Sequence, residues 1–283
     1  MRAKIRFILM AAMGCLGSAR NHLTPMTIQR PAIRMKSKLL SATLCLFVVA
    51  GTGWCPAAEA KARLLDHFGG LRGGFGKKNQ EKAKVLSGPT EVKMLRGESP
   101  GKVWQVTLGD TPFKITIEDK VNLQVADCLK RVENLPPAYR KVFQIVSEGT
   151  KNGVAIYANL DGAAAHGSQD YLNIVPDADA MVIAHESGHI LEQRVSSAQP
   201  KTLEHWQQAI TADKISVSAY GDQVAHEDLA EFALAYAMCL DAGKEKLTEL
   251  KRLSPQRFAQ WELILKTAAP AAKAASKPAA AKP

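Results

Sequence analysis

The sequence predicts a mixed α+β domain in which a small mixed sheet comes first and a helix-rich half follows. Residues 103–108 and 113–117 alternate apolar and polar side chains around Gly109-Asp110, a pattern typical of a β-hairpin. Beyond residue 180 the apolar residues recur instead with helical spacing. Residues 85–266, about 180 in number, are enough for one domain with its own core.

The elements between the hairpin and the helical half are expected to be short. Helices are expected at 122–132 and at 138–148, where Pro136 and Pro137 suit a first turn. Strands are expected at 153–159 and 171–175. A longer helix follows, capped by Asp177 or Asp179 and ending near Val195. The remaining helices are expected at 201–213, 227–240 and about 244–265.

The segments on either side of this domain have compositions that favour flexible chain. Residues 61–84 are rich in Gly and Lys, which predicts a flexible linker. Residues 267–283 consist almost entirely of Ala, Lys and Pro, which predicts a disordered tail.

The N-terminal segment predicts export of the protein. Starting at Met35, Lys36 and Lys38 precede an apolar run that leads to Ala58-Glu59-Ala60, the pattern of a cleaved signal peptide over residues 35–60. Residues 1–34 are then interpreted as an upstream extension that is not part of the native protein. A membrane anchor is the alternative, but the apolar runs are shorter than the ~20 residues that a span needs. A secreted or periplasmic protein without a stable membrane span is therefore expected.

Removal of the signal peptide would lower the net charge of the protein. The chain has 37 basic and 27 acidic residues, a formal net charge of +10. Residues 1–60 hold eight of the basic residues and one of the acidic ones, which leaves 29 and 26, or +3. So small a surplus is poor evidence for nucleic-acid binding, and none is expected.

Of the five cysteines, Cys128 and Cys239 remain after removal of residues 1–60, either as one disulfide or as buried small side chains.

Residues 185–189 read His-Glu-Ser-Gly-His within an apolar segment. On a helix, His185 and His189 at positions i and i+4 share one face, which suits two ligands of a tetrahedral Zn²⁺. Glu186 is then placed beside the open side of the metal, where a bound water needs a general base. A catalytic zinc has a third protein ligand and one open position, so a further ligand is expected elsewhere.

The third ligand is expected in a second motif that runs from Tyr220 to Phe232. Glu227 is the favoured ligand, with His226 as its competitor, because neighbours on a helix point about 100° apart and only one can face the metal. Glu231, one turn along, is placed to accept the second N–H of a ligand His, unless it is simply an exposed helix residue. Tyr220 is placed to stabilise an oxyanion, the alternative being a loop aromatic that covers the core.

Together the two motifs resemble the catalytic domain of anthrax lethal factor and the related Pro-Pro endopeptidases, which are gluzincin-type metallopeptidases. The pattern is His-Glu-x-Gly-His followed by Tyr-Gly-x₅-Glu-x₃-Glu-Phe. The resemblance implies that His185, His189 and Glu227 bind zinc, that Glu186 is the general base and that Tyr220 assists the oxyanion. A metzincin is excluded, because that class needs Gly and His where this chain has Glu192 and Val195.

The resemblance covers roughly residues 150–240 and implies a zincin-like fold, in which an edge strand over the active-site helix pairs with an extended peptide. Residues 167–175 fit the place of that strand. The chain departs from the family at residues 223–226, where Gln-Val-Ala-His replaces the usual Asn and acidic residue, so substrate preference does not carry over.

These observations predict an exported zinc endopeptidase that acts on a peptide or protein substrate in extended conformation. One alternative is a non-catalytic zinc-binding protein of the cell envelope, whose tail contacts anionic polymers. Another is a protease that its own linker or tail holds inactive. The base and oxyanion donor argue against a non-catalytic protein, because a structural zinc site is closed and needs neither.

Overall fold

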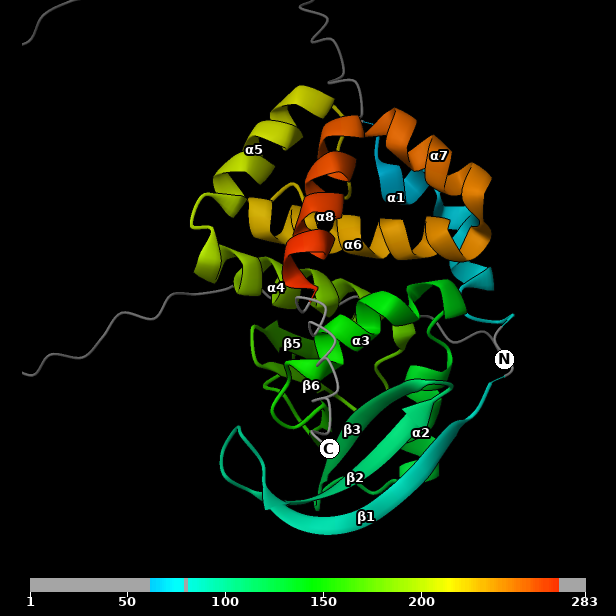
Figure 1. Ribbon diagram of the computed structural model, residues 1–283, viewed down its shortest axis with the longest axis vertical. Coiled ribbons are helices and arrows are strands. Elements are labelled where there is room, and N and C mark those ends of the chain that lie inside the picture. Colours follow the sequence, from blue (N-terminus) through cyan, green and yellow to red (C-terminus); the bar gives the residue numbers. More distant parts are fainter. Residues whose placement is uncertain (1–61, 79–80, 270–283) are drawn as a thin grey trace, which may run out of the picture. The chain divides into compact units, whose positions relative to one another are not determined.

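The computed structural model describes residues 62–78 and 81–269, and within them six strands form one mixed sheet (Figure 1). The strand order is β1-β2-β3-β4-β6-β5. β1 to β3 pair antiparallel, β4 is parallel to both β3 and β6, and β5 is antiparallel to β6. The strands are β1 Ala83–Lys93, β2 Pro100–Leu108, β3 Thr111–Glu118, β4 Val154–Ile156, β5 Ala165–Ser168 and β6 Tyr171–Ile174.

Helices make up most of the chain after the sheet, which confirms the α+β class. The helices that precede or interrupt the sheet are α1 Leu64–His67, α2 Val125–Glu133 and α3 Arg140–Glu148, with 3₁₀ turns η1 Gly69–Gly74 and η2 Pro137–Tyr139. Those that follow it are α4 Ala180–Ala198, α5 Thr202–Asp213, α6 Ala225–Ala242, α7 Lys244–Leu253 and α8 Pro255–Ala268. α4 is central, because it contacts β5 and β6 as well as α6.

The predicted hairpin is present as β2 and β3. Leu108 pairs with Thr111, and Gly109 takes a positive φ of 59° in the turn between them. Val106, Phe113 and Ile115 are buried, so the apolar positions of the alternating pattern form the core face of the sheet.

The position of the edge strand was predicted wrongly. Residues 171–175 correspond to β6, but β6 lies inside the sheet between β4 and β5, and β5 is the terminal strand. The proposed segment 167–175 in fact contains the end of β5, a tight turn and β6. The Ala-His-Gly-Ser sequence of β5 carries too little apolar bulk to signal a strand, which explains the error.

Residues 62–78 do not form the predicted flexible linker. Leu64, Leu65 and Phe68 are at most 3% exposed and belong to the main core. The backbone N–H groups of Leu64 and Leu65 donate to the carbonyls of Ser216 and Val217, at 2.9 and 3.0 Å. The large apolar side chains between the glycines outweigh the glycine content, because their burial favours an ordered segment.

Other boundaries also differ from the prediction. The domain begins before residue 85, because β1 starts at Ala83. One helix was expected over 244–265, but two are present, because Pro255 starts a new helix at its first position. The upstream extension 1–34 and the signal peptide 35–60 lie outside the described residues, as does residue 270 onward of the predicted tail.

Cys128 and Cys239 are buried and unpaired with each other, and burial raises the pKa of their thiols to about 11 and about 12.

No helix among residues 62–78 and 81–269 combines the length and apolar character that a membrane crossing requires.

Candidate metal centre

Helix α4 presents the first motif to a cleft beside β5. Asp179 caps the helix, its Oδ1 accepting from the backbone N–H groups of Met181 and Val182 at 2.9 and 3.1 Å. His185 and His189 lie one turn apart on the same face, with ring centroids 5.0 Å apart. The cap fixes where the helix begins and therefore which face of it reaches the cleft.

Gly188, within the first motif, allows α6 to approach α4 closely. A Cβ at this position would lie 2.6 Å from the Cα of Ala230, a distance that real side chains do not adopt. The glycine therefore removes a steric barrier at the helix crossing. The close crossing places Glu227, on the first turn of α6, opposite the two histidines.

His185, His189 and Glu227 form a group that could hold a metal ion. One ligand atom from each residue lies within 4.8 Å of the other two. The Oε2 atom of Glu227 is 3.5 Å from Nε2 of His185 and 3.4 Å from Nε2 of His189. That Oε2 atom is buried and accepts no well-formed hydrogen bond. Three donor atoms therefore face a common point, although His189 and Glu227 are 38 positions apart in the sequence.

Glu231 holds the ring of His185 from the side away from Glu227. Its Oε1 atom is 2.9 Å from Nδ1 of His185, and its side chain is 13% exposed. Glu231 is therefore not an exposed helix residue, and it occupies the position expected for a carboxylate that orients a ligand imidazole.

Tyr220 and Glu186 line the same cleft of about 570 Å³. The Tyr220 ring centroid is 6.1 Å from that of His185, and the residue is 48% exposed. Partial burial and the charge of Glu227 raise the pKa of Tyr220 to about 12, so its phenol keeps its proton at neutral pH. Glu186 is buried and packs against Gly167 of β5, where a Cβ would lie 2.9 Å from Glu186 Oε2.

His226, the competitor for the third ligand position, lies beside the group of three rather than within it. Its ring stacks on that of His189 with centroids 4.0 Å apart and an angle of 25° between the planes. Its Nδ1 atom is 3.2 Å from Oε2 of the buried Glu192. This arrangement positions the ring of His189, and His226 is not part of the group of three.

Two further residues of the cleft, Arg96 and His166, were not predicted as site residues from the sequence. Arg96, in the loop between β1 and β2, lines the cleft, and its Nη1 atom is 2.9 Å from Nδ1 of His166. His166 lies in β5 and lines the same cleft. Nothing in the local sequence around either residue signals this contact, since they are 70 positions apart.

A buried ion pair holds the start of α6 in place. Asp228, next to Glu227, accepts from Nε and Nη2 of Arg257 on α8 at 2.7 and 2.8 Å, and from Nε1 of Trp206 on α5 at 2.9 Å. Arg257 is fully buried and Asp228 is 1% exposed. The contacts of Asp228 therefore join α5, α6 and α8 next to Glu227 and hold that residue in place.

We expect Asp228→Ala to lower the free energy of unfolding by about 3 kcal/mol, the lower end for a broken buried ion pair, because the charge of Arg257 then keeps only the buried carboxylate of Asp213, 3.5 Å from its Nη1. Chemical denaturation followed by circular dichroism measures the change. Glu204→Ala is the matched control, since Glu204 lies exposed in the first turn of α5 and its loss should change stability by less than about 0.5 kcal/mol. Equal stability of the two variants would show that the buried pair contributes nothing.

The titration of His185 predicts how the metal-free protein responds to pH. Burial lowers the pKa of this imidazole, but the carboxylates of Glu227 and Glu231 outweigh burial and raise the pKa to about 9, from 6.5 for an ordinary histidine. Because the pKa is higher in the folded protein, the protonated ring stabilises the fold fully at pH values below the pKa of His185 in the unfolded chain. This contribution is lost as the pH rises through about 9.

We therefore expect the melting temperature of the chelator-treated protein to fall between about pH 6 and 10, and to fall less steeply in His185→Gln. Differential scanning fluorimetry on both proteins measures the two slopes. The variant is needed because buried thiols and phenols also destabilise the fold at high pH. Parallel slopes would contradict the assignment of a raised pKa to His185.

The cleft thus brings together two imidazoles, a carboxylate that faces both, a second buried glutamate and a protonated phenol. Such a set can hold a divalent cation and still offer a proton acceptor and a hydrogen-bond donor beside it. No protein-family model matches the chain, and neither a curated protein nor a solved structure matches it.

Proposed function

We propose that this protein is a zinc-dependent endopeptidase. The observation that carries the proposal is the convergence of His185, His189 and Glu227 on one point, with Glu186 buried next to them in an open cleft. Three protein ligands are typical of a catalytic zinc, which keeps one position for water or substrate, whereas structural zinc sites are closed by four.

The residues fit zinc better than a harder cation. Two imidazole nitrogens and one carboxylate oxygen are a donor set that zinc accepts readily, while Ca²⁺ and Mg²⁺ require a shell of oxygens. Glu227 Oε2 is buried without a hydrogen-bond partner, so a cation there would satisfy an atom that is otherwise costly to bury. Glu231 supports the same assignment by fixing the second nitrogen of His185.

The roles of the chain's own groups follow from their places around the metal group. A bound zinc would polarise the scissile carbonyl and acidify a water molecule. Glu186 accepts the proton of that water and passes it to the leaving amine. The protonated phenol of Tyr220 donates a hydrogen bond to the oxyanion that develops on the substrate carbonyl. β5, as the terminal strand of the sheet, offers an edge to which an extended peptide can add.

The proposal is tested by incubating the purified protein with a mixture of unrelated peptides and identifying the products by mass spectrometry. We expect cleavage at internal bonds that 1,10-phenanthroline abolishes and that added zinc restores. Release of single terminal residues would point to an exopeptidase instead. Bound zinc without any cleavage would favour the non-catalytic zinc-binding alternative.

A further inference from the structure

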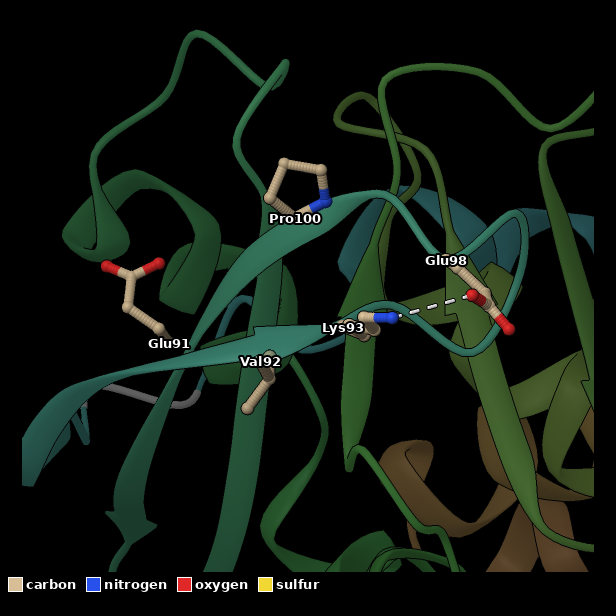
Figure 2. Close-up of a pocket in the computed structure, with 5 residues that line it drawn as sticks. All are labelled: Glu91, Val92, Lys93, Glu98 and Pro100. Atoms are coloured by element: carbon tan, nitrogen blue, oxygen red, sulfur yellow. Dashed lines mark ion pairs between the residues drawn. The ribbon is translucent and has the colours of Figure 1, made fainter.

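The loop between β1 and β2, residues 94–99, is anchored to the rest of the domain by Met94 and Arg96. Met94 is buried, and its N–H donates to the carbonyl of Ser99 at 2.8 Å. Lys93 and Glu98 form an exposed ion pair across the base of the loop (Figure 2), with 3.6 Å between Nζ and Oε2. Arg96, within the loop, donates its backbone N–H to the hydroxyl of Tyr157 at 3.0 Å. The loop therefore holds Arg96 at a set place beside β5.

The guanidinium of Arg96 gives one wall of the cleft a positive charge. Nη1 is 2.9 Å from Nδ1 of His166, and Nη2 forms an ion pair with Asp161. Arginine can only donate, so Nδ1 of His166 accepts and the ring carries its hydrogen on Nε2. This wall of the cleft therefore presents hydrogen-bond donors, one of which carries a full charge.

The other charged side chains that line the cleft are negative. They are Glu186 and Glu227, which lie beside His185 and His189. Among the described residues that line the cleft, Arg96 is the only Lys or Arg. In the zinc-loaded protein the metal offsets the charge of Glu227. Glu186 then repels a carboxylate on a bound peptide and Arg96 attracts it, so the favourable place of that carboxylate is beside Arg96.

Asp161 does not cancel the charge of Arg96. Its side chain is 79% exposed, so water screens most of its effect, whereas the side chain of Arg96 is 39% exposed. A guanidinium also has five N–H donors in a planar fork, more than His166 and Asp161 use through the two contacts described. Donors thus remain for a ligand carboxylate, and Asp161 acts as a weak competitor for them.

We propose that Arg96 determines substrate specificity, by selecting peptides that carry an aspartate or glutamate close to the bond at the metal group. The step from binding to cleavage rests on the proposed endopeptidase function, but recognition of the acidic side chain does not. A charge-assisted hydrogen bond at a half-exposed site, about 1.4 kcal/mol, corresponds to a preference of about tenfold.

The test uses fluorescein-labelled eight-residue peptides of an Ala-based sequence, in which each position in turn is Glu, Gln or Lys. Binding to zinc-loaded Glu186→Gln protein is measured by fluorescence anisotropy, and cleavage by the protein with Glu186 intact is measured as kcat/KM. At one position or at two neighbouring ones, we expect Glu peptides to bind about tenfold more tightly than their Gln partners. When Arg96→Gln is combined with Glu186→Gln, the Glu and Gln peptides should bind equally tightly. The affinity for the Gln peptides should not change.

Two further variants separate charge from a general effect on folding. Arg96→Glu should reverse the preference in favour of Lys peptides, and Asp161→Asn should strengthen the preference for Glu by removing the competitor. The inference would be overturned if all peptides bind equally, if none binds, or if the preference for Glu peptides survives in Arg96→Gln. Arg96-dependent binding without any cleavage by the protein with Glu186 intact would instead support it and contradict the endopeptidase proposal.

Discussion

Glu186→Gln is expected to lower peptide hydrolysis by ~10²–10⁴-fold while the protein keeps its zinc, because a general base contributes a factor of that size. The amide has the shape of the carboxylate but cannot accept the proton of the attacking water. Glu186 is outside the group of three that could hold the metal, so metal content should not change. The measurements are kcat/KM on a cleaved peptide and zinc content by elemental analysis on the same preparation.

The control for this variant is Glu204→Gln, the same chemical change at an exposed position of α5. It should leave kcat/KM and zinc content at the level of the unmodified protein. Turnover in Glu186→Gln within about tenfold of the unmodified protein would rule out a general-base role, because the loss would be smaller than proton transfer accounts for. Loss of zinc in Glu186→Gln would instead show that this side chain belongs to the metal group.

The periodic segments of this fold could be predicted from the sequence, and so could the short apolar strands β4 and β6, but β5 and α1 could not. The β2–β3 hairpin and α5 have long runs of alternating or helically spaced apolar residues, so their local pattern reports their burial. β5 has only four residues and little apolar surface. α1 is equally short, and the surrounding glycines obscured Leu64 and Leu65, whose burial depends on contacts with Ser216 and Val217 far along the chain.

The same distinction applies to the candidate site. His185, His189, Glu227 and Glu231 lie on two helices whose spacing repeats every turn, so a motif predicts which side chains share a face. Arg96 reaches His166, and Arg257 reaches Asp228, across 70 and 29 positions through tertiary packing alone. No local pattern encodes such contacts, which is why the positive wall of the cleft and the buried ion pair behind α6 emerge only from the structure.

Glu227→Ala is expected to weaken zinc binding by more than about 100-fold, since even residues that only orient a ligand cost 10–100-fold when they are lost. Glu227 Oε2 lies 3.5 and 3.4 Å from Nε2 of His185 and of His189, and no other carboxylate forms part of that group among the described residues. Zinc content after gel filtration, and competition with a chromophoric chelator, measure the loss.

His226→Ala is the matched variant, because it removes the neighbouring side chain from the same turn of α6. His226 lies outside the group of three, so zinc should be retained, with an affinity lowered only by the loss of the ring that stacks on His189. Zinc lost in His226→Ala and kept in Glu227→Ala would move the third ligand to His226. Neither change touches the contacts of Asp228 with Arg257 and Trp206 that hold the start of α6. A difference in zinc content between the two variants therefore reports the ligand itself and not the position of the helix.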